Sequence, residues 1–284
     1  MKLPSWLTKR VSSFEVIEEM EHLLHSFSVH TVCQEARCPN IGECFSQRTA
    51  AFMILGDVCT RNCYFCAVKK GKPLFPDMEE PERIAQVVAK LDLRYVVITS
   101  VTRDDLPDGG ARQFAGTITA IKKLCGEKTF VEVLIPDFCG SLSSLQEVLQ
   151  AKPLVLNHNL ETVPALYTEV RPEADYQRSL QLLKECKRIY PKIYTKSGLM
   201  VGLGEKKDEV VQVMQDLRNV DCDILTIGQY LRPSPEHLEV KEFIPPATFE
   251  WYEKVAYSLR FLYVASSPFV RSSYMAKNWL KSLT

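Results

Sequence analysis

Three closely spaced cysteines are the residues of this chain best suited to chemistry. Cys59, Cys63 and Cys66 lie within eight residues and follow the apolar run 51–55. An odd number of thiols cannot be fully paired as disulfides, and a structural zinc site normally has four ligands. Iron–sulfur clusters are held by cysteine thiolates, usually four to a cubane. The triad therefore predicts a cluster with one iron open to a small chelating molecule. A zinc knuckle or a chance group of buried thiols is the alternative.

A second cysteine triad ends fifteen residues before the first one begins. Its members are Cys33, Cys38 and Cys44, and the proline, asparagine and glycine between the last two predict a loop. Alone, this spacing would also fit a zinc site that a distant ligand completes. Because the two triads are so close in the sequence, we expect the second one to hold a second cluster.

The composition narrows the class of protein. A length of 284 residues suffices for one barrel-sized α/β domain or two smaller ones. The formal net charge is zero, so nothing points to a nucleic acid or a membrane surface as partner. Six of the ten cysteines fall in the triads, which favours metal binding in a reducing cytoplasm over disulfides. No apolar run approaches the roughly 18 residues of a membrane span, and early acidic residues argue against a secretory signal.

Apolar runs and helical patterns alternate from about residue 50 onward. Residues 84–91 and 210–217 carry apolar side chains at the i, i+3, i+4, i+7 spacing of helices, and the first 30 residues predict a further amphipathic helix. Six apolar runs predict buried parallel strands: 51–55, 95–100, 130–135, 154–157, 197–203 and 224–230. Six strand–helix units predict a parallel sheet or barrel, with ligands outside the carboxyl ends of the strands.

Polar residues on these strands are the candidate cofactor contacts. They are Thr99, Ser100, Glu132, Asn157, Asn159, Lys196 and Gln229. Each one could equally serve as a turn or cap residue.

The first triad, with the aromatic Phe65 just before its last cysteine, resembles the radical S-adenosylmethionine superfamily. That resemblance implies that the open iron binds S-adenosylmethionine through its amino and carboxylate groups, with Phe65 and the strand-end residues as cofactor contacts. It also implies an α/β fold, namely a partial (β/α)6 TIM barrel with N- and C-terminal extensions that close its open face. We expect the extensions at 1–48 and 263–284 and the barrel at 49–262.

Longer stretches along the whole chain resemble the lipoyl synthase family. The matching stretches are 33–44, 52–56, 99–111, 132–138, 157–163, 195–204, 226–233 and 271–274. The resemblance implies radical-mediated insertion of two sulfur atoms at C6 and C8 of an octanoyl group on a lysine of a lipoyl carrier domain. It also implies two [4Fe–4S] clusters, of which the second, auxiliary cluster donates the sulfur.

The Arg-Ser-Ser-Tyr stretch at 271–274 predicts only a turn or helix cap before a last helix at 275–280. The family resemblance implies that Ser273 is the fourth ligand of the auxiliary cluster, beside Cys33, Cys38 and Cys44. A hydroxyl oxygen suits iron in a sulfide cluster less well than thiolate, so this ligand could leave when the cluster is degraded.

The same resemblance implies the partners. The expected substrates are octanoylated lipoyl domains of 2-oxoacid dehydrogenase E2 subunits and the glycine-cleavage H protein. Reduced flavodoxin or ferredoxin would donate electrons, and an iron–sulfur cluster carrier would rebuild the auxiliary cluster. Arg171, Arg178 and Arg232 follow strand ends and are either solvated surface or docking groups for an acidic carrier domain.

Two other classes of protein remain as alternatives. One is a different radical S-adenosylmethionine enzyme with an auxiliary cluster, and the other is a zinc-bound, non-catalytic binding protein built on the two triads. A zinc protein is colourless, whereas two iron–sulfur clusters make a protein brown.

Overall fold

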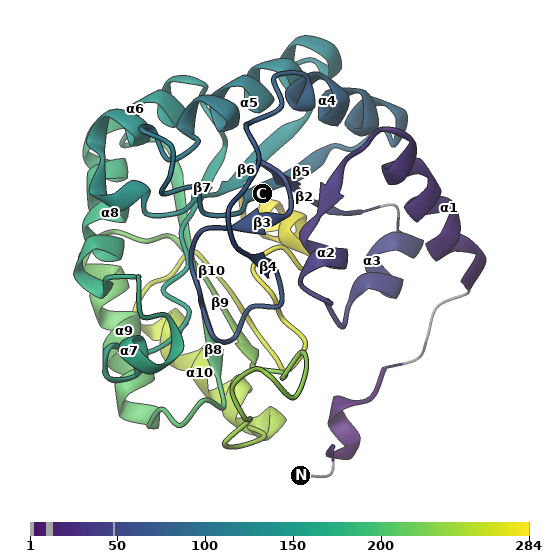
Figure 1. Cartoon of the computed structure of the whole chain (residues 1–284). Coiled ribbons are helices and arrows are strands. Elements are labelled where there is room, and N and C mark those ends of the chain that lie inside the picture. The colour runs from purple at the N-terminus through teal and green to yellow at the C-terminus, as the bar shows by residue number, and fades with distance from the viewer. Residues whose placement is uncertain (1–2, 10–13, 48, 284) are drawn as a thin grey trace. The chain divides into compact units, whose positions relative to one another are not determined.

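The computed structural model describes residues 3–9, 14–47 and 49–283, and its elements are shown in Figure 1. The chain divides into two compact units. Among the described residues, unit 1 takes in 3–9, 62–66 and 157–283, and unit 2 takes in 14–47, 49–61 and 67–156.

Unit 2 is built on a mainly parallel sheet. Its strands lie in the order β1 (His30–Thr31), β2 (Ala51–Ile54), β5 (Tyr95–Ser100), β6 (Phe130–Leu134) and β7 (Val155–Asn157), of which the last residue, Asn157, belongs to unit 1. Strands β2, β5 and β6 are parallel, whereas β1 runs antiparallel to β2. A separate parallel pair, β3 (Val58–Cys59) and β4 (Lys69–Lys70), carries the first cysteine of the first triad.

The helices of unit 2 bury apolar faces against this sheet. The unit's helical elements are α1 (Phe14–Ser26), α2 (Val32–Glu35), α3 (Ile41–Ser46), α4 (Glu80–Lys90), α5 (Ala111–Cys125), η2 (Phe138–Gly140) and α6 (Leu142–Gln150). Helices α4, α5 and α6 pack side by side (Figure 1). The predicted apolar face of α4 is confirmed, because Ile84, Val87 and Val88 are fully buried.

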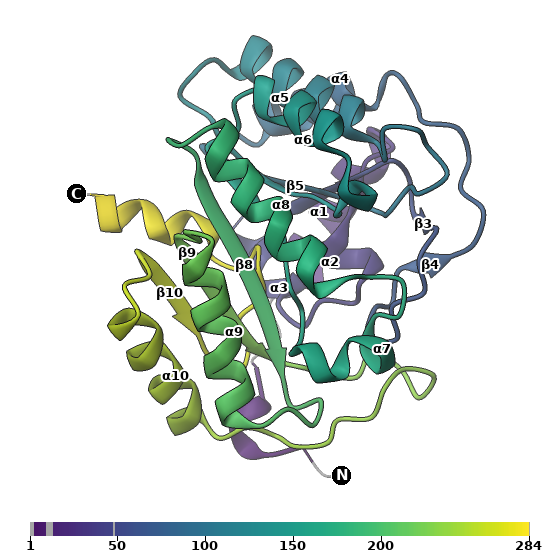
Figure 2. The same ribbon diagram turned by 90° about the vertical axis from the view of Figure 1, so that its left-hand side faces the viewer.

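Unit 1 repeats the alternation of strands and helices. Its strands β8 (Tyr194–Val201), β9 (Ile224–Gln229) and β10 (Tyr263–Ser266) are parallel and adjacent in that order. Its helical elements are η1 (Ser5–Leu7), η3 (Pro164–Leu166), α7 (Tyr167–Val170), α8 (Tyr176–Ile189), α9 (Lys207–Asn219), α10 (Pro246–Ser258) and η4 (Ala276–Leu283). Helices α8 and α9 run alongside the long strand β8 (Figure 2).

The structure confirms all six predicted strands and adds four short ones that the sequence did not reveal: β1, β3, β4 and β10. Strand β10 has only four residues, and Val264 alone among them is buried, so its apolar pattern is too weak to predict a strand. The second triad is not wholly a loop, because Cys33 and Cys44 lie on α2 and α3. The last helix is a 3-10 helix rather than an α-helix. Within the described residues, no helix is long and apolar enough to cross a membrane.

Candidate active site

Cys59 lies in unit 2, at the end of the short strand β3. Its Sγ accepts a hydrogen bond from the backbone N–H of Thr102 at 3.3 Å, and its carbonyl oxygen accepts one from Gly71 at 3.0 Å. The backbone N–H of Thr60, the next residue, donates to the Thr102 carbonyl at 3.0 Å. The segment after strand β5 therefore fixes the backbone and thiol of Cys59.

Arg61, between the first two cysteines of the first triad, anchors this part of the loop. Its guanidinium donates to both carboxylate oxygens of Asp104, at 2.6 and 2.9 Å, and to Asp137 Oδ1 at 2.5 Å. Arg61 is 5% exposed and Asp137 is fully buried. Burial lowers the pKa of Arg61, but the bonds to the two carboxylates outweigh it and raise the pKa above its usual value. This buried ion pair joins the cysteine loop to the ends of strands β5 and β6.

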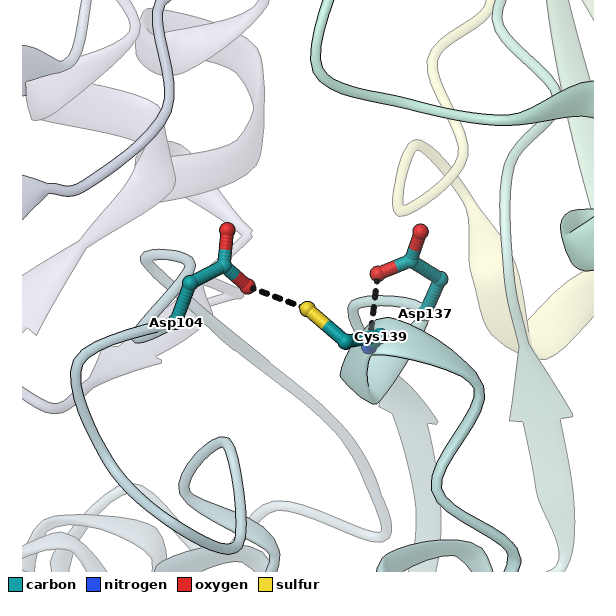
Figure 3. A group of neighbouring side chains, drawn as sticks. All are labelled: Asp104, Asp137 and Cys139. Carbon is teal, nitrogen blue, oxygen red and sulfur yellow. Dashed lines mark hydrogen bonds between the residues drawn. The ribbon is translucent and has the colours of Figure 1, made fainter.

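Asp104, Asp137 and Cys139 lie close to one another, as Figure 3 shows. Their ligand atoms lie within 4.8 Å of one another, a spacing that could hold a metal ion. However, Arg61 Nη2 contacts all three, including Cys139 Sγ at 3.5 Å. The Cys139 thiol donates to Asp104 at 3.2 Å, and burial together with Asp104 raises its pKa. The Arg61 guanidinium thus offsets the negative charge of the two carboxylates in this group.

Cys63 and Cys66 lie in unit 1, where the backbone around them is tied down. The N–H of Cys66 donates to the carbonyl of Cys63 at 3.2 Å, and Tyr64 donates to Val170 at 3.0 Å. His237 Nε2 lies 3.1 Å from the carbonyl oxygen of Cys66. Phe65 packs against a buried cluster formed by Val170, Leu203 and Tyr230. Phe65 therefore anchors the loop on the core of unit 1.

The second triad spans α2, the turn that follows it and α3 in unit 2, with Cys38 in the turn. Cys38 N–H donates to the Cys33 carbonyl at 3.0 Å, and Cys44 N–H donates to Asn40 at 2.9 Å. Cys33 is 5% exposed. Burial, and to a lesser extent Cys38, raises the pKa of the Cys33 thiol to about 11. All ten cysteines fall within the described residues and none of them is in a disulfide, and cysteine thiolates are the usual ligands of iron–sulfur clusters.

The predicted cofactor contacts of unit 2 differ in whether their side chains already have hydrogen-bond partners. Thr99 Oγ1 donates to the Leu134 carbonyl at 3.1 Å, and Glu132 accepts from the Tyr95 hydroxyl at 2.6 Å. Ser100 Oγ is buried and has no hydrogen-bond partner among the described residues. A buried polar group usually finds a partner, so Ser100 is well suited to contact a bound ligand.

Asn157 and Gln229 are both fully buried in unit 1. The Gln229 amide donates to three carbonyls, those of Val201, Tyr230 and Glu242, at 2.9 to 3.2 Å, and accepts from the N–H of Ile244 at 2.8 Å. It thereby holds the chain that follows strands β8 and β9.

The Arg-Ser-Ser-Tyr segment forms a turn, since Tyr274 N–H donates to the Arg271 carbonyl at 3.0 Å. Lys196 donates to the Ser272 carbonyl at 2.6 Å, and Asn159 Nδ2 donates to Ser272 Oγ at 2.8 Å. Residue 228 is glycine because a Cβ there would lie 2.0 Å from the Val270 carbonyl oxygen. Ser273, the next residue, is therefore positioned by contacts to strands β8 and β9 and to the segment after β7.

Sequence reasoning missed the residues that position the predicted ligands. Arg61 lies within the first triad, and Asp137 lies in the matching stretch 132–138. Nothing in the sequence shows that these two residues pair across 76 residues. Ser272 was passed over beside Ser273, although it is the serine that binds Asn159. One signal was available for Arg61, since an arginine between two ligand cysteines is well placed to fix their loop.

The expectation that Arg171 lies at an exposed docking surface is wrong. The side chain is 8% exposed and donates to the carbonyls of Asn159 and Leu160 at 2.9 and 3.1 Å. Its guanidinium also lies 5.3 Å from the centre of the Tyr167 ring. An arginine after a strand end is equally suited to bind backbone carbonyls, and here that role prevails.

Comparison with known proteins defines the class. The Radical SAM superfamily model matches residues 53–217, more than half of the chain. Streptococcus suis SuiB bound to S-adenosylmethionine matches with a TM-score of 0.57 at 14% identity, over 86% of this chain and 58% of SuiB. HydG, a maturase of the [FeFe]-hydrogenase, matches with a TM-score of 0.58 at 13% identity, over 87% of this chain and 55% of HydG. The predicted fold class, a partial barrel of the radical S-adenosylmethionine type, is confirmed.

Curated relatives narrow the class to one family. A lipoyl synthase of Caldanaerobacter subterraneus is 58% identical over 97% of this chain and 96% of its own length. That of Caldicellulosiruptor saccharolyticus is 57% identical over 99% of this chain and 98% of its own length. The chain therefore belongs to the lipoyl synthase family, whose members are sulfurtransferases of the radical S-adenosylmethionine superfamily. Membership of that superfamily implies a [4Fe–4S] cluster and S-adenosylmethionine.

Proposed function

We propose that this chain inserts two sulfur atoms at C6 and C8 of an octanoyl group that is amide-linked to a lysine of a lipoyl carrier domain. The observation that carries the proposal is the presence of two cysteine triads, all six thiols outside disulfides, on a chain similar to lipoyl synthases along nearly its full length. One triad suffices to cleave S-adenosylmethionine. The second triad calls for a second function, which we assign to sulfur donation.

The two triads take different roles in this proposal. Cys59, Cys63 and Cys66 hold the cluster that binds S-adenosylmethionine. The auxiliary [4Fe–4S] cluster is bound by a second set of ligands: Cys33, Cys38, Cys44 and Ser273. The donor sets fit, because thiolates are the usual ligands of such clusters and none of these cysteines is in a disulfide.

The reaction explains why the chain needs bound cofactors. The C–H bonds at C6 and C8 are unactivated, and no side-chain base whose pKa is tuned by a few units could deprotonate them. When bound, the first cluster and S-adenosylmethionine supply the one-electron chemistry that breaks these bonds, and the auxiliary cluster supplies sulfur. The chain itself holds the ligand loops in place through Arg61 and through the Lys196 and Asn159 contacts to Ser272.

We propose the same strand-end residues as the S-adenosylmethionine contacts, with Phe65 beside them. Ser100 has the best support, since its buried hydroxyl lacks a partner among the described residues. Asn159, another of the predicted contacts, has similar support, since its buried Oδ1 also lacks a hydrogen-bond partner among the described residues. Thr99, Glu132 and Asn157 stay predictions. Gln229 also stays a prediction. Its side-chain amide binds the backbone of Glu242 and Ile244, so it would position that segment near the cofactor.

The proposed partners follow from the reaction. A lipoyl carrier supplies the octanoyl group: an E2 subunit of a 2-oxoacid dehydrogenase or the glycine-cleavage H protein. Reduced flavodoxin or ferredoxin supplies electrons, and a cluster carrier rebuilds the auxiliary cluster. Ten cysteines outside disulfides fit the reducing cytoplasm, where we place the enzyme. We expect no nucleic acid or membrane partner, and we assign residues 1–48, 49–262 and 263–284 to the N-terminal extension, the barrel and the C-terminal extension.

Anaerobic turnover tests the proposal. The cluster-loaded protein is incubated with S-adenosylmethionine, dithionite and an octanoyl-lysine peptide, and the peptide is analysed by mass spectrometry. We expect a product that has gained two sulfur atoms, together with 5′-deoxyadenosine. Formation of deoxyadenosine with an unchanged peptide would support the role of the first triad and contradict the proposed substrate. Neither product from brown, cluster-loaded protein would overturn the catalytic proposal.

A further inference from the structure

An exposed apolar loop connects β4 to α4 in unit 2. Three of its large side chains face solvent, with exposed fractions of 88% for Leu74, 96% for Phe75 and 73% for Met78. Single exposed apolar residues are ordinary, but three of them within five residues form a patch that folding alone does not require.

The loop holds these side chains outward through fixed ends. At one end, Gly71 N–H donates to the Cys59 carbonyl at 3.0 Å. At the other, Asp77 accepts from Arg83 at 2.6 Å, and its carbonyl accepts from Gln113 at 2.8 Å. Pro73 and Pro76 flank the Leu-Phe pair and restrict its backbone. Such a preordered loop loses little conformational entropy when a partner binds.

The charge of the same segment is positive. Lys69, Lys70 and Lys72 are all exposed. The loop also holds two acidic residues, Asp77 and Glu79, and Arg83 pairs with both of them, at 2.6 and 3.8 Å; its hydrogen bond lowers the pKa of Asp77. The patch thus combines an apolar centre with a cationic edge, which complements an acidic partner with an apolar spot.

The segment also lies directly beside a proposed cluster ligand. Strands β3 and β4 are paired in parallel, with Cys59 opposite Lys70. Neighbouring strands lie only about 4.8 Å apart. A protein docked on the lysines is therefore close to the cysteine whose cluster must receive an electron.

We propose that Lys69, Lys70, Lys72, Leu74 and Phe75 form the docking surface for an acidic one-electron donor of the flavodoxin class. The donor gives up one electron and is oxidised, the cluster bound by the Cys59 triad is reduced by one electron, and no atoms are exchanged. The inference rests on the proposed function, because only an enzyme that cleaves S-adenosylmethionine reductively needs this donor.

Binding to a flavodoxin tests the surface without turnover. Two variants of the cluster-loaded enzyme are compared with wild type by calorimetry: K69E/K70E/K72E and L74S/F75S. Controls from the same unit are K123E/K128E/K152E, which alters exposed lysines elsewhere, and L124S/L142S, which alters leucines that are 54% and 46% exposed. We expect the charge variant to weaken binding about tenfold or more at ~50 mM salt and much less at ~500 mM salt. The apolar variant should weaken binding about tenfold at both salt concentrations, and the controls should bind like wild type.

Turnover with two different reductants shows whether the surface binds the electron donor or the lipoyl carrier domain. With dithionite and an octanoylated lipoyl domain, both variants should match wild type. With reduced flavodoxin, their KM for flavodoxin should rise about tenfold. If dithionite-driven turnover of the lipoyl domain falls while that of a short octanoyl-lysine peptide does not, the loop recognises the carrier and the inference is overturned. Unchanged flavodoxin binding would overturn it as well.

Two further outcomes are distinguishable. If wild type forms a dimer in sedimentation that L74S/F75S abolishes, the surface binds a second copy of this chain and the inference fails. If wild type forms no lipoyl product even with dithionite, the proposed function fails, whereas the calorimetric comparison still decides whether the surface binds flavodoxin.

Discussion

The two cysteine triads are held in different ways. Around the first triad, an irregular loop is fixed by long-range contacts, above all the Arg61 pairs with Asp104 and Asp137. The second triad lies on two short helices, and local backbone bonds hold it within the segment 33–44. A rigid, ion-paired loop suits a cluster that must remain intact through each turnover. A short segment held only by local contacts suits a cluster that is degraded and rebuilt, because it can release the iron.

Removing single cysteines should have the largest effects on activity and should separate the roles of the two triads. Cys59→Ala should reduce both 5′-deoxyadenosine and lipoyl product to background, because the first cluster loses a ligand. Cys33→Ala should keep deoxyadenosine formation and lose sulfur insertion. Both products are measured by mass spectrometry after anaerobic turnover. Loss of deoxyadenosine in both variants, with the first cluster still loaded, would contradict the division of roles.

Replacing Ser273 tests its proposed role as the fourth ligand beside the second triad. Ser273→Cys should retain two clusters by iron analysis but release sulfur more slowly, since thiolate binds iron more firmly than a hydroxyl does. We expect a fall in lipoyl product of about tenfold or more, with deoxyadenosine formation preserved. Ser267→Cys, in the same C-terminal part of the chain, is the control. Full activity of Ser273→Cys would remove Ser273 from the ligand set.

Removing the arginine anchor should affect the first triad through stability. Arg61→Met leaves the fully buried Asp137 without its charged partner, which should cost about 3–5 kcal/mol in the free energy of unfolding. Urea unfolding measures the loss. Arg188→Met, which breaks an exposed pair with Glu185, should cost less than about 1 kcal/mol. The double variant R61M/D137N should recover part of the loss, and equal costs for both arginines would contradict the buried anchor.

A methyl group at residue 228 should disturb the Arg-Ser-Ser-Tyr turn. Gly228→Ala places a Cβ 2.0 Å from the Val270 carbonyl oxygen, so the turn must shift, at a cost of about 1–3 kcal/mol. Lipoyl product should fall more than deoxyadenosine. Gly126→Ala has open space around its Cβ and separates the steric effect from the loss of a glycine, although its positive φ also carries strain. Equal losses in the two products would place the effect outside the turn.

Removing Cys139 should have the smallest effect. Its thiol is exposed and donates to Asp104, and a serine hydroxyl can make the same bond. Cys139→Ser should change the free energy of unfolding by less than about 0.5 kcal/mol and leave both products unchanged. Iron content that falls in this variant would show that Cys139 binds metal and would contradict the charge balance provided by Arg61.

The sequence by itself determined the chemistry and the class of fold. Ligand cysteines must recur at short spacings, and buried parallel strands must be continuous apolar runs, so both are visible along the chain. All six predicted strands are present, and the first triad and its neighbouring Phe65 pointed to the superfamily that the comparisons confirm. The short strand β10 escaped because its four residues carry almost no pattern.

Only the tertiary structure decided how these parts are held. Arg61 meets Asp137 across 76 residues, and Asn159 meets Ser272 across 113. Arg171 looked like a surface cation in the sequence and is buried against backbone carbonyls. Leu74 and Phe75 are large apolar side chains, yet the structure leaves them facing solvent. Burial and long-range pairing depend on which segments fold against each other, and that information is spread over the whole chain rather than written at any one position.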